Sequence, residues 1–215
     1  MSGESAMLAQ TSHDLIPGFA DPVHDAQKTF RAILDAMAHP GRIVDLPVKV
    51  QAPRPLRCAA TAVALTLFDH DTPVWLDTTV AESGRAMDFL RFHCGCPFVD
   101  GPGKGRFALI GDTTTLPHLG RFDAGSEAWP DESATLVIEV SGLDGGPAVT
   151  LAGPGIERET SFAPYDLPDW FWGAWAVNHA AYPLGLDIIL TCGKTLAALP
   201  RSTAARIAGG PAEKA

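Results

Sequence analysis

The segment "RFHCGCP", residues 91–97, gathers a histidine and two thiols, which are the side chains that most often bind zinc. A structural zinc site takes four such ligands, commonly with paired cysteines separated by two residues, because this spacing lets both thiolates reach one tetrahedral ion. Cys94 and Cys96 are one residue closer than that, and Cys58 and Cys192 lie far away in the sequence. The pattern favours reduced thiols packed at a helix end, and we expect no bound metal.

Five side chains, His93 among them, could form an acid/base centre if the fold brought them into one cleft. They are Asp69, His70, Asp71, His93 and Asp187. The first three stand between a helix and a strand, where loops often carry catalytic carboxylates. However, no nucleophile stands beside them, and the trio also fits the end of a helix followed by a turn. We therefore expect no catalytic residues, and keep a stand-alone acid/base enzyme as the alternative.

Asp187 differs from the others because it stands inside the apolar segment "LGLDIILTC". A carboxylate buried alone costs several kcal/mol, so it must be hydrogen-bonded, paired or protonated. An arginine such as Arg91 or Arg57 is the expected partner.

Two lysine-containing stretches imitate phosphate-binding loops. A P-loop needs a glycine six residues before its lysine and a Ser or Thr after it, so that backbone amides surround the phosphates. Ile188 stands where "GKT" would need that glycine, and Phe98 stands there for "GPGKGR". The fingerprints G-x-S-x-G and, after a strand, G-x-G-x-x-G are also absent. The sequence therefore lacks the usual motifs of hydrolases and of dinucleotide-binding proteins.

Large aromatic side chains crowd the segment "DWFWGAW". Trp170, Phe171, Trp172 and Trp175 point around more than one side of a helix, so a single core-facing stripe does not hold them all. Because tryptophan is enriched at the centres of interfaces, Trp170, Trp172 and Trp175 form a candidate partner interface. The alternative is an aromatic helix packed within its own domain.

The elements that must position these residues alternate between helix and strand in the first half of the chain. Helices are predicted at residues 22–39, 57–68, 84–93 and 166–183, the first with Asp21 as N-cap. One stripe of the first helix holds Phe30, Ile33, Leu34 and Met37. Strands are predicted at residues 42–46, 72–77, 106–112, 134–142, 148–153, 185–192 and 195–200.

Two pairs of these strands are expected to form hairpins. Residues 134–142 and 148–153 flank the turn "GLDGGP", and Gly193 and Lys194 turn the strand 185–192 into its successor. Residues 112–132 have no clear period and predict a long loop, and the last dozen residues look frayed. The pattern favours an α/β fold of three α/β/α layers around a mixed sheet.

Composition limits the classes of partner. The chain has 215 residues, 46% of them hydrophobic, and a formal net charge of -9. This charge repels phosphate backbones and anionic lipids, so we expect neither nucleic acid nor membrane as a partner. With no secretory or membrane-spanning segment, the sequence predicts a cytoplasmic protein. We expect a flexible segment at residues 1–20, a single domain at residues 21–204 and a flexible tail at residues 205–215.

Five ordered segments carry a resemblance to a known family: "FRAILDAMAHPGRI", "DHDTPVWL", "LRFHCGCP", "AYPLGLDIILTCG" and "ALPRST". Together they resemble the PhnH family, the H subunits of the bacterial carbon-phosphorus lyase system, from about Asp21 to about Thr203. The family pattern does not require cysteine at positions 94 and 96, which weakens the metal interpretation further.

The resemblance implies an accessory subunit that works with G, I and J subunits and forms a homodimer when isolated. It implies a part in transferring ribose triphosphate from ATP to an alkylphosphonate, while the J subunit's iron-sulfur chemistry breaks the carbon-phosphorus bond. The implied fold is similar to the large domain of transferases that use pyridoxal phosphate. That cofactor needs a lysine with an anionic partner for its ring nitrogen, and Lys28, Lys49, Lys104 and Lys194 show none, so we expect no cofactor.

Overall fold

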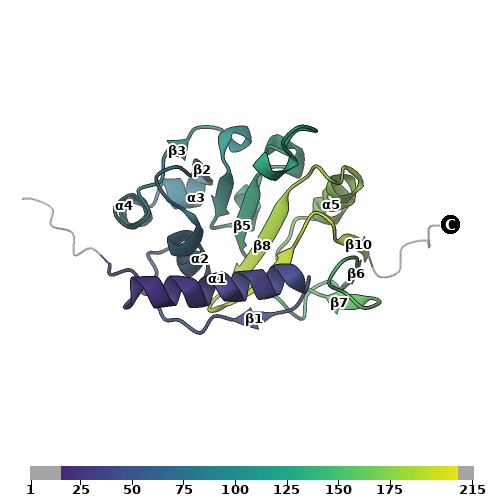
Figure 1. Cartoon of the computed structure of the whole chain (residues 1–215), viewed down its shortest axis with the longest axis horizontal. Coiled ribbons are helices and arrows are strands. Elements are labelled where there is room, and N and C mark those ends of the chain that lie inside the picture. The colour runs from purple at the N-terminus through teal and green to yellow at the C-terminus, as the bar shows by residue number, and fades with distance from the viewer. Residues whose placement is uncertain (1–15, 208–215) are drawn as a thin grey trace, which may run out of the picture.

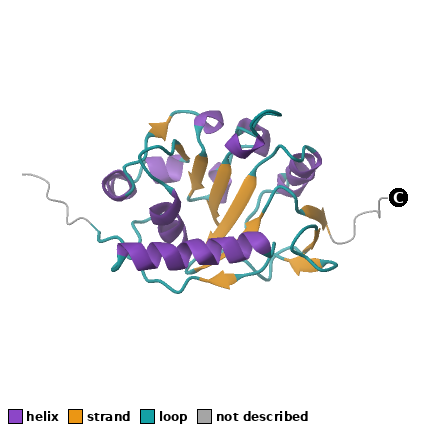
Figure 2. Cartoon of the chain, viewed as in Figure 1, coloured by secondary structure: helices purple, strands orange, loops and turns teal. Residues whose placement is uncertain are grey.

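A seven-stranded mixed sheet runs through the centre of the molecule, with helices packed against both of its faces (Figures 1 and 2). The computed structural model describes residues 16–207 of the chain. The strands of this sheet are β1 (Val44–Asp45), β2 (Val74–Leu76), β3 (Phe98–Val99), β4 (Phe107–Ile110), β5 (Thr135–Glu139), β8 (Asp187–Cys192) and β9 (Thr195–Leu199). They lie in the order β1-β9-β8-β5-β4-β2-β3.

Neighbouring strands from β8 to β3 are parallel, whereas β9 runs antiparallel to both of its neighbours. Parallel strands need crossover connections, and helices supply several of them. The helices are α1 (Pro22–Ala38), α2 (Cys58–Leu67), α3 (Thr78–Ala81), α4 (Gly84–His93) and α5 (Phe171–Ala180). The predicted mixed α/β architecture is confirmed.

Strand β8 shows why the sheet lies between two layers. Its apolar residues are buried on both faces, as expected for a strand covered on both sides. Ile189 contributes to the core formed with α1, α2 and α4, while Ile188 and Leu190 contribute to the core formed with α5. The alternation of side chains along the strand divides the interior into these two cores.

Helix α1 begins at the predicted residue. Two of its large apolar side chains lie outside the face that it buries. The side chain of Asp21 accepts a hydrogen bond from the His24 amide, and Pro22 follows at the first turn. Of the stripe named above, Ile33 is buried and Met37 is half-buried, but Phe30 and Leu34 are 45% and 50% exposed. The helix instead packs through Asp25, Thr29, Ala32, Ile33 and Ala36.

A second sheet corrects two predictions from the sequence. Its strands are β6 (Val149–Ala152), β7 (Thr160–Phe162) and β10 (Ala204–Ile207), in the order β10-β6-β7. Strand β6 therefore does not pair with β5, and the predicted hairpin is wrong. The expected frayed end holds an edge strand, because β10 pairs with β6 over four residues and packs against α5. Such long-range pairing leaves no local signal.

The residues that precede α1 pack against the domain. Ile16 and Phe19 pack against the core beside α4, within the segment expected to be loose. The predictions for residues 1–15 and 208–215 lie outside the described residues. The long loop predicted at residues 112–132 contains three short 3₁₀ helices, η2 (Thr113–Thr115), η3 (Leu119–Arg121) and η4 (Pro130–Glu132). A further 3₁₀ helix, η1 (Pro102–Lys104), precedes β4.

Within residues 16–207, no helix combines the length and the apolar composition that crossing a bilayer requires.

Candidate functional site

The cysteines of "RFHCGCP" act as packing groups at the end of α4. Burial raises the pKa of Cys94 to about 12 and the pKa of Cys96 to about 11, so both thiols are protonated at neutral pH. A protonated thiol is a poor metal ligand and a poor nucleophile. Within residues 16–207, no three His, Cys, Asp or Glu side chains are placed together as metal ligands.

The side chain of His93 binds the segment that precedes α1, residues 16–20, and is not free to bind a substrate. Its Nε2 atom donates a hydrogen bond of 2.9 Å to the carbonyl oxygen of Ile16. The ring packs against Phe89 and Phe92, at centroid distances of 4.4 and 5.0 Å. His93 is therefore engaged in fixing residues 16–20 on α4.

The structure does not bring the five candidate acid/base residues together. Asp69 accepts hydrogen bonds from the Asp71 amide at 3.0 Å and from the Thr72 hydroxyl at 2.6 Å. The Thr72 hydroxyl is the main reason that the pKa of Asp69 is lowered, and this pattern is a turn that follows α2. His70 lies 3.2 Å from Asp71, with both side chains in solvent.

Asp187 begins β8 at the same edge of the sheet, but β4 and β5 separate β8 from β2. At about 4.8 Å per strand, this places the start of β8 roughly 14 Å from the start of β2. The loop before β2, with Asp69, His70 and Asp71, thus lies well apart from Asp187.

Arg201 is the partner of Asp187, which corrects the expected pairing with Arg91 or Arg57. The guanidinium donates from Nη2 to Oδ2 at 2.5 Å and from Nε to Oδ1 at 3.3 Å, and the Arg201 amide donates to Oδ1 at 2.8 Å. Arg201 also donates to the Pro130 carbonyl at 2.7 Å. Because the β8–β9 hairpin pairs Ile188 with Leu199, Arg201 lies beside Asp187, and the register of the predicted hairpin could have revealed this pair.

Ligands of open parallel sheets bind at the carboxyl ends of the strands, where successive connections diverge. That point lies between β2 and β4 here, because β2 leads outward to β3 and the chain then returns to β4. Asp77 follows β2 at this point and is fully buried. Its Oδ1 accepts from the Val80 amide at 2.9 Å, and its Oδ2 accepts from the Gly111 and Asp112 amides, each at 3.2 Å, and from the Thr115 hydroxyl at 2.6 Å.

Asp77 therefore occupies the place of an anionic ligand. The same backbone amides that could hold a phosphate oxygen are already bonded to a carboxylate of the chain. Sequence reasoning missed this residue. Its signal is an aspartate directly after a buried strand and directly before a short helix.

Glu139 fills the equivalent place at the carboxyl end of β5. Its Oε2 accepts from the Arg57 amide at 2.7 Å, at the start of α2, while its Oε1 has no hydrogen-bond partner among residues 16–207. The Arg57 guanidinium is 4.0 Å away. Burial raises the pKa of Glu139 to about 7, because these contacts compensate only part of the lost hydration.

Asp77 and Glu139 together close the edge of the sheet where a nucleotide or phosphonate would be expected to bind. Neither carboxyl group offers a positive charge to a triphosphate. The cationic side chains do not compensate. Lys28, Lys104 and Lys194 are exposed and each pairs with a nearby aspartate, at 3.1, 2.8 and 3.1 Å.

The candidate aromatic interface separates into core and surface. Trp175 is 0% exposed, and its indole Nε1 donates a bond of 2.9 Å to the Thr203 carbonyl. It belongs to the core, and we leave it out of the contact surface. Trp170 and Trp172 are half-buried, and the Trp170 ring lies 5.0 Å from that of His118.

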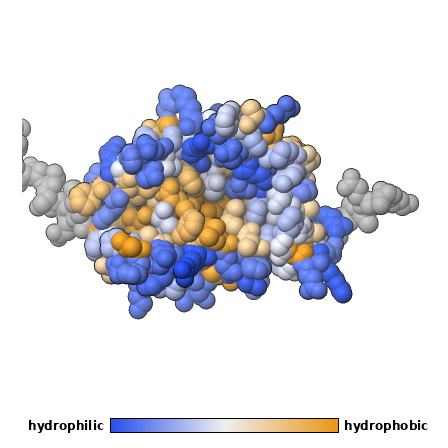
Figure 3. Space-filling view, in the orientation of Figure 1, coloured by the Kyte–Doolittle hydropathy of each residue, from blue (hydrophilic) through white to orange (hydrophobic). Residues whose placement is uncertain are grey.

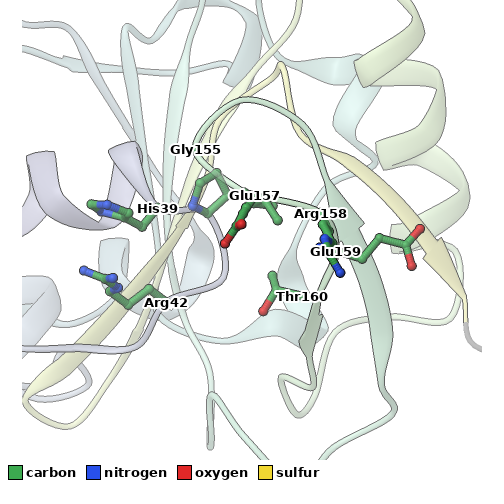
Figure 4. Close-up of a pocket in the computed structure, with 9 residues that line it drawn as sticks. His39, Arg42, Gly155, Glu157, Arg158, Glu159 and Thr160 are labelled. Atoms are coloured by element: carbon green, nitrogen blue, oxygen red, sulfur yellow. The ribbon is translucent and has the colours of Figure 1, made fainter.

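An open groove of about 730 Å³ lies between the end of α1 and the segment that leads into β7. His39 and Arg42 form one side, and Glu157, Arg158 and Thr160 form the other (Figure 4). Two of its charged side chains pair with residues outside the lining, because Arg42 contacts Asp35 at 3.4 Å and Glu159 pairs with Arg206. The groove offers no concentrated charge for a triphosphate.

The chain is similar to known proteins along almost all of its length. Residues 17–206 match the family described as bacterial phosphonate metabolism protein (PhnH). A relative in Rhizobium meliloti (strain 1021) is 43% identical over 185 residues, covering 86% of this chain and 92% of the relative, and is named alpha-D-ribose 1-methylphosphonate 5-triphosphate synthase subunit PhnH. A relative in Stutzerimonas stutzeri, named as the C-P lyase subunit protein HtxG, is 30% identical over 183 residues, covering 85% and 87% of the two chains.

Proposed function

Because the chain belongs to the PhnH family of bacterial phosphonate metabolism proteins, we propose that it is an accessory subunit of the carbon-phosphorus lyase system. In this role it is required, with partner subunits, for the transfer of ribose triphosphate from ATP to an alkylphosphonate. The observation that carries the proposal is the 43% identity to a subunit of alpha-D-ribose 1-methylphosphonate 5-triphosphate synthase over 92% of that relative.

The accessory character of the subunit is supported by the site itself. Triphosphate chemistry uses amide cradles, basic side chains or carboxylates that hold magnesium. At the carboxyl edge of this sheet, Asp77 takes the amides, and Glu139 takes the start of α2. The chain then contributes shape and contact surface, and its partners contribute the reacting groups.

The proposed partners are the G, I and J subunits, with a homodimer when the chain is isolated and a cytoplasmic location. The half-buried Trp170 and Trp172 are proposed as one contact with these partners. We propose that the chain resembles the large domain of pyridoxal-phosphate transferases in its fold alone. The cofactor itself does not fit, because Lys28, Lys49, Lys104 and Lys194 are all exposed, and Lys28, Lys104 and Lys194 each pair with a nearby aspartate.

Reconstitution tests the proposal. The purified chain is incubated with ATP and methylphosphonate, alone and with the purified G and I subunits, and the release of adenine is measured by chromatography. We expect no adenine from this chain alone, release from the combined subunits, and loss of that release when this chain is omitted. Adenine release by this chain alone, or undiminished release without it, would overturn the proposal.

A further inference from the structure

Several large apolar side chains of helix α1 lie on its exposed face, not on the face that packs against the core. The buried face consists mainly of small or polar side chains, Asp25, Thr29, Ala32 and Ala36, with Ile33. These residues let the helix lie close to β9 and α2. Val23, Phe30 and Leu34 are 76%, 45% and 50% exposed. We call these three residues the α1 stripe.

The three residues lie on one side of the helix. Their spacing of seven and four residues corresponds to nearly whole turns of an α-helix, so their side chains are aligned along its axis. Figure 3 shows apolar residues gathered over the centre of this face, around α1 and α2, with hydrophilic residues above and below. Contiguous exposed apolar surface with a polar rim is typical of a protein contact.

The charges beside the stripe indicate what kind of surface covers it. Arg31 lies on the exposed flank of α1 and has no ion-pair partner among residues 16–207, whereas Lys28 pairs with Asp25 at 3.1 Å. A two-fold contact would place this patch against its own copy and bring the Arg31 side chains of two copies to one interface. A different subunit can offer carboxylates to the same flank, which favours a heterologous partner.

We propose that the α1 stripe is the contact surface for another protein subunit of the complex, one that presents an apolar patch edged by carboxylates. The proposal rests on the proposed function, which requires the chain to assemble with partners. In this arrangement the small residues of α1 face the chain's own core, and the large ones enter the partner.

The test is co-purification with the co-expressed G, I and J subunits. The tagged chain carries Phe30→Glu and Leu34→Glu together, and the amount of each partner retained is measured. The matched control is Ile207→Glu, which changes another apolar residue that is 60% exposed, at the far end of the second sheet. We expect the double variant to retain at least about tenfold less partner than the wild type, and the control to retain as much as the wild type.

Melting temperatures of the isolated chains separate contact from folding. The double variant should melt within about two degrees of the wild type, because both side chains are substantially exposed. Should it melt lower, Val23→Glu alone, at the most exposed position of the stripe, must show the loss of partner without a change in melting temperature.

Three results would overturn the proposal. One is full retention of the partners by the variants. Another is full retention with loss of a wild-type homodimer, which assigns the stripe to a second copy. The last is full retention of the partners by the double variant, together with a melting temperature that the substitutions lower in the full chain but not in a chain that lacks residues 1–15. That result would assign the stripe to residues 1–15. If the wild type itself retains none of the three subunits, the proposed function fails instead.

Discussion

Asp77 and Glu139 have different hydrogen-bond environments at the carboxyl ends of β2 and β5. Asp77 accepts four hydrogen bonds and is fully satisfied although no part of it is exposed. Glu139 accepts one hydrogen bond, and its Oε1 has no hydrogen-bond partner in the part of the chain that the structure describes. A buried carboxylate of the second kind is favoured in its protonated form.

Glu139 should therefore make the stability of the protein depend on pH. The ordinary glutamate pKa is 4.5, and burial raises the pKa of Glu139 to about 7. Between these values the folded protein keeps a proton that the unfolded chain has lost, so the free energy of unfolding falls as pH rises through this range. The shift corresponds to about 3 kcal/mol lost by pH 8.

We expect Glu139→Gln to be more stable than the wild type at pH 8 by up to about 3 kcal/mol, and nearly equal to it at pH 4.5. Urea denaturation at a series of pH values measures the difference. Glu132→Gln is the control, because Glu132 is exposed and pairs with Arg106 at 3.5 Å. A difference between wild type and Glu139→Gln that stays constant from pH 4.5 to pH 8 would disprove the assignment.

At the scale of elements, local pattern located most helices and the central strands. The start of α1 follows from Asp21 and Pro22, and the buried strand β8 follows from its apolar run. The turn at Gly193 and Lys194 joins β8 to β9 as predicted, and its register contains the Asp187–Arg201 pair. These features depend on neighbours in sequence, so the sequence is sufficient to find them.

Elements that depend on distant partners could not be found in this way. Strand β10 exists because β6 supplies its hydrogen bonds, and these strands are about fifty residues apart in the chain. Likewise, the exposure of Phe30 and Leu34 depends on which face of α1 meets β9 and α2. The hydrophobic pattern of α1 indicates an amphipathic helix but does not say that its large side chains point outward.

Helix α5 gives a prediction that separates its core residues from its surface residues. Trp175→Ala should lower the free energy of unfolding by about 3–5 kcal/mol, because it leaves a cavity and an unbonded Thr203 carbonyl. Trp172→Ala, at a half-buried position, should cost less than half as much. Denaturant unfolding measures both, and equal losses for the two variants would contradict this division of the helix.

At the scale of the whole molecule, the features agree on a subunit that supplies surface. The net charge of -9 and the carboxylates at the sheet edge disfavour a triphosphate site. The exposed α1 stripe favours a protein contact. The family could be identified from ordered motifs in the sequence, and the comparison with relatives confirms it. The closed sheet edge could not, because its hydrogen bonds join residues more than thirty positions apart.

Binding of ATP by the isolated chain tests this account most directly. Isothermal titration calorimetry with ATP and magnesium, on protein shown to be folded by its melting transition, measures it. We expect no saturable binding, meaning a Kd weaker than about 1 mM. One-to-one binding in the micromolar range would contradict it, because the chain would then hold a triphosphate site of its own.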